Sequence, residues 1–311
     1  MKHIIGTTDF QLHNSAISLG KFDGIHIGHQ KLMHEICKEQ NGLNPAVFTF
    51  DLRDIKINPI YTEEERIQKF KRLGIRTVVS YPFNEAVMKL EPREFIRNVL
   101  VGRMDAKKIV VGEDFHFGHN RKGDTALLRQ CAGEFGFELI SMKKLSYDGT
   151  VVSSTRIREE LQNGRIDLVN EMLGEPYYIY GTVVHGRHIG KKIFHMPTIN
   201  LLIPEHKLLP PFGVYASLTR IEGKTYEGVT NLGRKPTVEG ENPVGAETYL
   251  FDTEEDLYGK QASVSLLSFQ RKERRFPSLE ALKEQIQRDT GQAREYFKTN
   301  KAKESVGLRN F

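Results

Sequence analysis

The chain has 311 residues, of which 39% are hydrophobic and 27% charged, and its formal net charge is +5. This length favours two domains over a single core. No stretch approaches the roughly 18 consecutive apolar residues of a membrane span, which excludes a membrane-spanning protein. The small surplus of Lys and Arg is spread along the chain, whereas nucleic-acid-binding proteins usually concentrate it in a stripe. We therefore expect no nucleic-acid partner.

The N-terminal segment, MKHIIGTTDF, lacks the long apolar stretch and the cleavage site of a secretory signal. Cys37 and Cys131 lie in separate predicted helices, without a CxxC motif or a Cys/His cluster. Neither a disulfide framework nor a zinc site is therefore indicated. We expect a cytoplasmic protein with ordinary buried thiols and no membrane partner.

In the first half of the chain, short β-branched runs alternate with amphipathic stretches, a pattern typical of a parallel sheet with crossover helices. A capping box at Thr62–Glu65 opens one helix, which ends at Leu73 before a glycine. Two further helices are predicted over Glu91–Val101 and Thr125–Gly133. The predicted strands are Ala16–Leu19, Ala46–Phe50, Thr77–Ser80, Lys108–Val111 and Phe137–Ile140.

From about Tyr177 onward, β-rich segments are separated by Gly, Pro and Asn turn signals, which is typical of an antiparallel barrel or sandwich. This half closes with a predicted helix over Ser278–Phe297, which Ser278 can cap. The pattern changes near Leu173–Pro176. The predicted domains are therefore residues 1–174 and 175–311.

Two histidines, His26 and His29, bracket Gly28 where the first predicted strand gives way to a helix. A turn at a helix N-terminus presents free backbone N–H groups, which suit a phosphate. Gly28 removes a side chain that would hold a phosphate away, and a phosphate would favour charged imidazoles. A single His here would more often lie on an ordinary surface turn. Two of them, at the carboxyl end of a strand, favour a ligand site.

The run GKFDGIHIGH, Gly20–His29, resembles the HxGH signature of the nucleotidyltransferase superfamily. Its FDG context is similar to the adenylyltransferase half of bacterial bifunctional riboflavin kinase/FAD synthetases. That family also has an SSTxIR signature, which Ser153–Arg158 matches. The resemblance implies an α/β nucleotidyltransferase-like first domain, a riboflavin-kinase-like β-barrel with a terminal helix, and a transferase of FAD biosynthesis.

The hydroxyl groups of this second signature stand at a predicted helix start, where they either cap the helix or bind phosphate oxygens. The resemblance favours contact with ATP, whose triphosphate charge Arg158 can neutralise. The segment Val110–Gly118 is similar to the family's flavin-side segment. Phe117 can pack there on the isoalloxazine ring, although a Phe beside a strand is more often part of the core.

The resemblance implies attack of the FMN phosphate on the α-phosphate of ATP, with release of pyrophosphate and FAD as product. Alignment and charge stabilisation suffice for such a transfer, and His26, His29, Arg158, helix N–H groups and Mg²⁺ can supply them. The nucleotide- and flavin-binding residues implied in this half are Gly20, Phe22, Asp23, Gly24, Gly28, Asp114, Phe117, Ser153, Ser154 and Thr155.

The segment Gly181–Leu201 resembles the ATP-binding segment of riboflavin kinases, including a PTxN element. Thr198 and Asn200 lie two residues apart in this element and point to the same side of an extended chain, so their oxygens can bind Mg²⁺. Glu247 occupies the position of the family's catalytic glutamate and can accept the proton of the riboflavin 5′-hydroxyl as it attacks ATP. Further ligand contacts implied in this half are Gly190, Lys191, Asn231 and Arg271.

Two stretches depart from the family pattern. After Phe50 the chain continues with Asp51-Leu52-Arg53, where family members commonly have a Pro-His-Pro loop. Before Pro197 it has Phe194-His195-Met196, where members usually have a glycine and an aromatic residue. The second departure leaves an alternative open, a monofunctional FMN adenylyltransferase with a degenerate kinase domain. A different class, a non-enzymatic regulator that binds flavin or nucleic acid, is disfavoured by the intact signatures.

Overall fold

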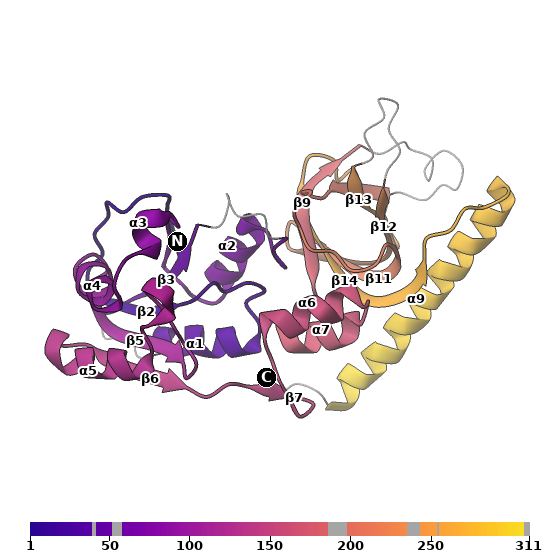
Figure 1. Cartoon of the computed structure of the whole chain (residues 1–311). Coiled ribbons are helices and arrows are strands. Elements are labelled where there is room, and N and C mark those ends of the chain that lie inside the picture. The colour runs from indigo at the N-terminus through magenta and orange to yellow at the C-terminus, as the bar shows by residue number, and fades with distance from the viewer. Residues whose placement is uncertain (39–41, 52–57, 186–197, 235–242, 254, 308–311) are drawn as a thin grey trace. The chain divides into compact units, whose positions relative to one another are not determined.

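The computed structural model of the chain forms two compact units, Met1–Ser154 and Thr155–Phe311 (Figure 1). The structure describes the chain except for residues 39–41, 52–57, 186–197, 235–242, 254 and 308–311, and the side chains beyond residue 300. Among the described residues, no helix combines the length and the apolar character that a membrane span needs.

A six-stranded parallel sheet forms the centre of the first unit, in the order β1-β4-β3-β2-β5-β6. The five strands predicted in this half are confirmed, and β1 at one edge is additional. The strands are β1 (Lys2–Ile5), β2 (Ser15–Leu19), β3 (Asn44–Phe50), β4 (Thr77–Tyr81), β5 (Ala106–Gly112) and β6 (Glu138–Met142).

Both faces of this sheet are buried, because alternate residues of one strand point to opposite sides. Ile17 of β2 enters one core, and its neighbour Ala16 enters the other. Helices α1 (Ile27–Cys37) and α2 (Glu63–Arg72) cover the Ala16 side. The other side is covered by a π-helical segment, Phe95–Val101, and by α5 (Thr125–Phe135). The first unit also contains α3 (Glu85–Met88), α4 (Pro92–Glu94), a 3₁₀ turn (His119–Arg121) and the hairpin β7 (Ser146–Tyr147) and β8 (Thr150–Val151).

The predicted capping box begins α2. The Thr62 hydroxyl accepts a hydrogen bond from the Glu65 amide at 3.3 Å, and the Glu65 carboxylate accepts one from the Thr62 amide at 2.8 Å. Two backbone donors of the first turn are thereby satisfied, so the start of this helix is fixed. The helix then ends before Gly74, whose φ is +83°.

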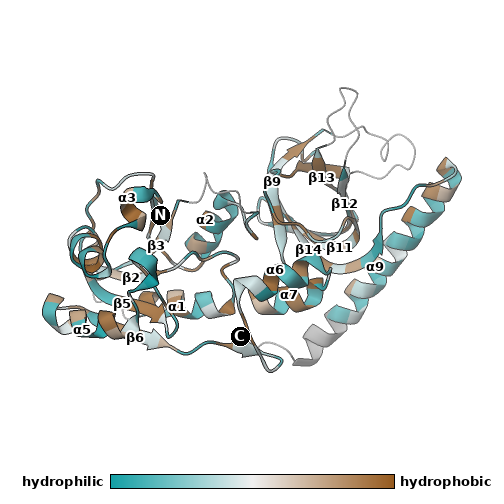
Figure 2. Ribbon diagram, viewed as in Figure 1, coloured by the Kyte–Doolittle hydropathy of each residue, from teal (hydrophilic) through white to brown (hydrophobic). Residues whose placement is uncertain are grey.

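The second unit begins with α6 (Ser154–Gln162) and α7 (Ile166–Leu173), followed by a closed antiparallel barrel in the order β10-β13-β12-β11-β14-β9. The barrel alternative of the sequence prediction is thus confirmed. The chain ends in α9 (Leu279–Gly307), which begins where predicted and is mostly teal with separate brown patches in Figure 2. The barrel strands are β9 (Tyr178–Val184), β10 (Thr198–Leu202), β11 (Gly213–Ile221), β12 (Lys224–Arg234), β13 (Val244–Leu250) and β14 (Gln261–Lys272).

Strand alternation gives the barrel an inner and an outer face. Inside, the Thr230 hydroxyl lies 2.7 Å from that of Ser217 and 2.8 Å from that of Thr248, and all three residues are fully buried. Outside, residues of the opposite parity pack against Ala293 and Phe297 of α9. The hydroxyl chain therefore satisfies the buried hydroxyl groups of Ser217, Thr230 and Thr248, while the alternate residues face outward.

Thr230→Val removes the central member of this hydroxyl chain, so Ser217 and Thr248 lose a buried partner. We expect the free energy of unfolding of the barrel to fall by about 1–3 kcal/mol. Urea denaturation of the full chain, with hydrogen exchange of β12 peptides to assign the transition, measures this change. Thr225→Val, at an exposed position of the same strand, is the matched control, and an equal effect of both variants would contradict the prediction.

Candidate active sites

Two stacked imidazoles form the corner between β2 and α1. His26 is the N-cap residue of α1, and its Nδ1 accepts a hydrogen bond from the His29 amide at 3.4 Å. The rings of His26 and His29 lie 3.7 Å apart at an interplanar angle of 20°. A Cβ at Gly28 would lie 3.1 Å from two atoms of the His26 ring. Gly28 therefore makes room for this imidazole, besides the phosphate access expected from the sequence.

Both imidazoles are neutral near pH 7 in the protein without ligand. Burial, and to a lesser degree the charge of Lys69, lowers the pKa of His26 from 6.5 to about 4. The pKa of His29 is held well below its usual value by burial and then by His26, Arg66 and Lys69. Since the Nδ1 of neutral His26 accepts a hydrogen bond, its proton lies on Nε2. The charged imidazoles anticipated from the sequence would need a bound anion to offset this burial.

The positive charge near the corner comes from α2, which the sequence analysis did not select. Arg66 donates through Nη2 to the carbonyl of Lys21 at 2.9 Å and to the Thr49 hydroxyl at 3.1 Å. Lys69 is only 2% exposed, and its Nζ lies 4.6 Å from the centre of the Tyr61 ring. Arg66 and Lys69 share the helical spacing of the core-facing Phe70. A cation on the apolar stripe of a helix is the signal that would have found them.

The loop before α1 is shaped by residues that the family signature contains. Phe22 is buried at a φ of +49°, and its ring lies edge-on to His29 at 5.1 Å. A Cβ at Gly20 would lie 3.1 Å from the Phe22 ring, and Gly24 has a φ of +81°. Asp23 accepts a hydrogen bond from the Ile60 amide at 2.9 Å. These four residues build the corner, while their contacts with a nucleotide stay a prediction.

The second signature reaches the same loop through Ser154, whose hydroxyl donates to the Asp23 carbonyl at 2.6 Å. Ser154 is also the first residue of α6, and Thr155 and Arg158 follow it within the first turns of that helix. Ser153 immediately precedes the helix. One hydroxyl of the signature therefore has a structural partner, and phosphate contact by the others stays a prediction.

The predicted flavin-side residues differ in exposure. Phe117 is 8% exposed and packs against Phe95 and Phe115, with ring centres 5.8 and 5.5 Å away. A Cβ at Gly123 would come within 2.8 Å of the Phe117 ring. Phe117 thus belongs to the core, as is usual for a Phe beside a strand. Its contact with the flavin stays a prediction. Asp114 pairs with Lys144 at 2.8 Å on the surface.

In the second unit, the register of the barrel aligns three predicted site residues. Glu247 of β13 lies directly opposite Asn200 of β10 on one side and Asn231 of β12 on the other. Their strand neighbours Thr230 and Thr248 bond inside the barrel. Asn200, Glu247 and Asn231 therefore share the outer face, and we call them the outer-face row. Thr198 lies two residues before Asn200 in β10 and has the same parity.

Arg271 continues this row across the barrel, because Val214 of β11 pairs with both Asn231 and Arg271. Asp289 of α9 accepts hydrogen bonds from Nε and Nη2 of Arg271 at 2.9 and 2.7 Å. Asp289 is 2% exposed and also accepts from the Gln285 amide at 2.7 Å. The terminal helix therefore holds this guanidinium in one orientation.

The donor atoms of the row suit a hard cation. Thr198, Asn200 and Glu247 offer hydroxyl, amide and carboxylate oxygens, the ligands that Mg²⁺ prefers alongside substrate phosphates. In the described parts of the chain, no group of three or more His, Cys, Asp and Glu residues is placed to hold a metal ion. Mg²⁺ coordination largely by substrate, with few protein ligands, fits these residues. Gly190, Lys191 and Phe194–Met196 lie outside the described residues, as do Leu52 and Arg53.

Comparison with known proteins assigns both halves. The FAD synthetase family model matches residues 9–156, and the riboflavin kinase family model matches residues 173–297. The bifunctional riboflavin kinase/FMN adenylyltransferase of Bacillus subtilis is 34% identical, over 91% of this chain and 92% of its own. The chain belongs to this bifunctional family. A family member from Escherichia coli K12 is 33% identical over 90% of this chain and 92% of its own.

A solved structure shows a similar fold over most of the chain. The crystal structure of a protein named as a macrolide-efflux protein from Streptococcus pneumoniae matches with a TM-score of 0.77 and 30% identity, over 92% of this chain and 94% of that one. The family resemblance and the fold class inferred from the sequence are thus confirmed. Both family domains are present in one chain, so the protein is a transferase of FAD biosynthesis, and a degenerate kinase domain receives no support.

The buried His26 makes stability depend on pH. The unfolded chain binds this proton near pH 6.5, whereas the folded protein resists it until about pH 4. The free energy of unfolding therefore falls as the pH drops through this window. We expect His26 to account for about 2 kcal/mol of the loss between pH 7 and pH 5, and His26→Gln to remove that part.

Urea denaturation of the full chain at both pH values, with hydrogen exchange of α1 peptides, measures this effect. His34→Gln, at an exposed position of the same helix, should keep the full pH dependence. An unchanged pH dependence in His26→Gln would show that the ring titrates normally.

Proposed function

We propose that the first unit adenylylates FMN to FAD and that the barrel phosphorylates riboflavin to FMN, each with its own ATP. The observation that carries the residue assignment is the buried His26–His29 stack at the N-terminus of α1. Its neutral rings and the free N–H groups of the helix provide donors for the phosphates of a nucleotide. The family membership supports the two reactions.

In the adenylyl transfer, a phosphate oxygen of FMN attacks the α-phosphorus of ATP, and the bond to the bridging oxygen of the β-phosphate breaks. Pyrophosphate leaves, so donors are needed where its negative charge develops. We assign this role to His26 Nε2, to His29 and to Arg158, with Gly28 keeping the first turn of α1 accessible. The supporting ligand contacts that we propose are Gly20, Phe22, Asp23, Gly24, Ser153, Ser154 and Thr155 for ATP, and Asp114 and Phe117 for the flavin.

In the kinase reaction, the riboflavin 5′-hydroxyl attacks the γ-phosphorus of ATP, and ADP leaves. Glu247 accepts the hydroxyl proton as the new bond forms. Asn231 stands beside Glu247 in the row, and the guanidinium of Arg271, held by Asp289, contacts a ligand. We propose further contacts with ATP for Gly190 and Lys191.

Thr198 and Asn200 are the residues that would hold Mg²⁺ in the barrel domain. When bound, the ion would neutralise phosphate charge and orient the triphosphate. The residues themselves are positioned by β10, whose pairing with β9 and β13 fixes the strand on both sides. The ion thus needs only two protein oxygens, with substrate phosphates and water completing its coordination.

We propose a functional boundary at residues 174/175, which keeps the whole SSTRIR signature and its helix with the adenylyltransferase. The compact units divide earlier, after Ser154, and the two family models leave residues 157–172 unassigned. We further propose a cytoplasmic enzyme with small-molecule substrates and no nucleic-acid or membrane partner. The weak, dispersed charge supports this assignment.

His29→Ala should stop FAD formation from FMN and ATP, with a loss of at least about 100-fold, because it removes a donor at the departing pyrophosphate. The formation of FMN from riboflavin should stay within about twofold of the unsubstituted protein, because it uses the barrel. Chromatographic separation of flavins after incubation with ATP and Mg²⁺ measures both. His34→Ala is the control on the same helix, and a His29→Ala protein that still makes FAD would refute the corner as the adenylyltransferase site.

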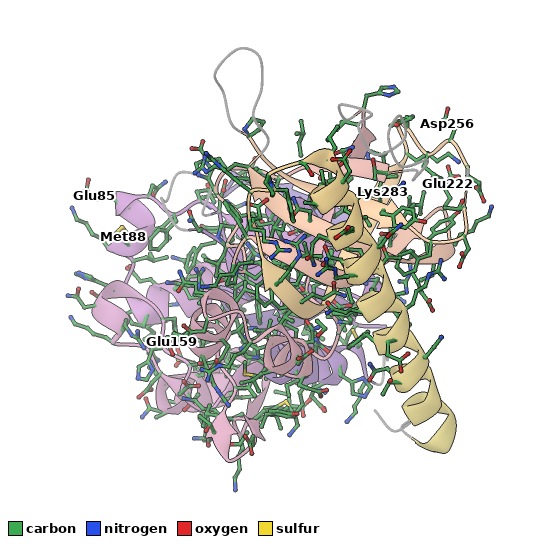
Figure 3. All side chains as sticks on the ribbon, turned by 90° about the vertical axis from the view of Figure 1, so that its right-hand side faces the viewer. Glu85, Met88, Glu159, Glu222, Asp256 and Lys283 are labelled. Atoms are coloured by element: carbon green, nitrogen blue, oxygen red, sulfur yellow. The ribbon has the colours of Figure 1, made fainter. Side chains whose placement is uncertain are left out.

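Glu247→Gln should produce the opposite pattern. Without the carboxylate base, FMN formation should fall by about 10²–10⁴-fold, while FAD formation from added FMN continues. The same assay, started from riboflavin or from FMN, separates the two steps. Glu222→Gln replaces an exposed glutamate at the turn between β11 and β12 (Figure 3) and should leave both reactions unchanged. Loss of both products in folded Glu247→Gln would mean that the two sites are not separate.

A further inference from the structure

A buried lysine on α2 has no role in the reaction described so far. Lys69 is 2% exposed, which is rare for an ammonium group, because its transfer from water into a protein interior is costly. The face of the Tyr61 ring, 4.6 Å from Nζ, offsets part of this cost. The stem lies on the apolar stripe of α2 beside the buried Phe70. A leucine or methionine would fill this position without the penalty.

The surroundings of Lys69 contain polar atoms suited to a ligand. Among the described residues, Arg66 Nε and His29 Nδ1 are buried without a hydrogen-bond partner. A buried polar atom whose hydrogen bond is not made destabilises the folded protein. Arg66 and Lys69 lie one helical turn apart on α2, and both act electrostatically on His29. An unsatisfied guanidinium nitrogen of Arg66 and an unsatisfied nitrogen of His29, together with the ammonium of Lys69, are typical of a site that an anion completes.

In the described parts of the chain, the cationic side chains that act on the two imidazoles both come from α2. Lys69 acts on both imidazoles, and Arg66 acts on His29. The carboxylates of Asp23 and Glu63 interact with Arg66 and favour its charged form, and that guanidinium already donates to Lys21 and Thr49. Because the imidazoles are neutral, the attraction for a polyanion comes from α2 and from the N-terminus of α1.

We propose that Lys69 supplies positive charge to the histidine corner and is a positioning residue for the pyrophosphate portion of the nucleotide in adenylyl transfer. This inference rests on the proposed function of the corner. The ammonium attracts the β- and γ-phosphates toward His26 and His29, and it adds to the burial that keeps the imidazoles neutral until the phosphates arrive. The conventional role of a buried lysine is to pack through its aliphatic stem, which requires no charge. Substitutions that keep the stem but remove the charge distinguish this role from the proposed one.

The reverse reaction, in which FAD and pyrophosphate yield FMN and ATP, isolates this site because the kinase does not use pyrophosphate. In Lys69→Met, which preserves the stem volume but removes the charge, we expect the KM for pyrophosphate to rise about tenfold. Lys69→Arg should restore it to within about threefold, because the charge returns. Lys71→Met, at an exposed position of the same helix, should leave it unchanged.

Two further measurements distinguish the charge from packing. Calorimetric titration with pyrophosphate alone should show weaker binding in Lys69→Met, with a reduced dependence on salt. The acid limb of the pH profile of FAD formation should move to higher pH, because a neutral side chain no longer opposes protonation of His26 and His29. FMN formation from riboflavin should be unchanged, which reports an intact barrel.

A Lys69→Met protein with unchanged KM for pyrophosphate, unchanged calorimetric affinity and unchanged acid limb would overturn the inference. So would equal losses in Lys69→Met and Lys69→Arg, since these would indicate packing. If Lys69→Met does not fold, Lys69→Gln provides the neutral variant. Retention of FAD formation in His29→Ala would instead remove the proposed function itself. If His29→Ala loses FAD formation while Lys69→Met keeps full activity with pyrophosphate, only the role of Lys69 is refuted.

Discussion

Desolvation of two imidazoles at the start of α1 sets the electrostatics of the histidine corner. The stack of His26 on His29 exists because Gly28 lacks a side chain and because Phe22 closes the other side of His29. Burial keeps both rings uncharged, and the stack holds them in one orientation. The positive charge that acts on these rings comes from Lys69 and Arg66 of a neighbouring helix, α2.

In the barrel, strand alternation and strand register position the predicted site residues. The two-residue period of a strand separates hydroxyls that bond inside, such as Thr230, from side chains that face outward, such as Asn231. Strand register then places Asn200, Glu247 and Asn231 side by side although they are distant in the sequence. A shift of one residue in any of these strands would send its member of the row into the interior.

Local signals were sufficient for much of this architecture. The capping box at Thr62, five of the six strands of the parallel sheet and the barrel segments follow from periodicity and turn residues, and the paired signatures indicated the family. The short edge strand β1 was missed because KHII has little alternation and only one buried residue. Lys69 was missed because sequence patterns usually assign lysine to solvent, and its place on the buried stripe of α2 beside Phe70 was not weighed against that rule. The orientation of Arg271 depends on hydrogen bonds to Asp289, eighteen residues later, and no periodicity or capping pattern connects the two residues.

The hydrogen bonds between Arg271 and Asp289 give the terminal helix α9 a second structural role besides covering apolar surface. Ala293 and Phe297 attach α9 to the barrel wall, and Asp289 on the same helix fixes the direction of Arg271. A protein shortened after β14 would retain the sequence of every barrel strand. Its Arg271 guanidinium, however, would lose the Asp289 carboxylate that orients it. Partial proteolysis or fusion at the C-terminal end therefore changes the surroundings of Arg271 as well as the apolar contacts of the barrel wall.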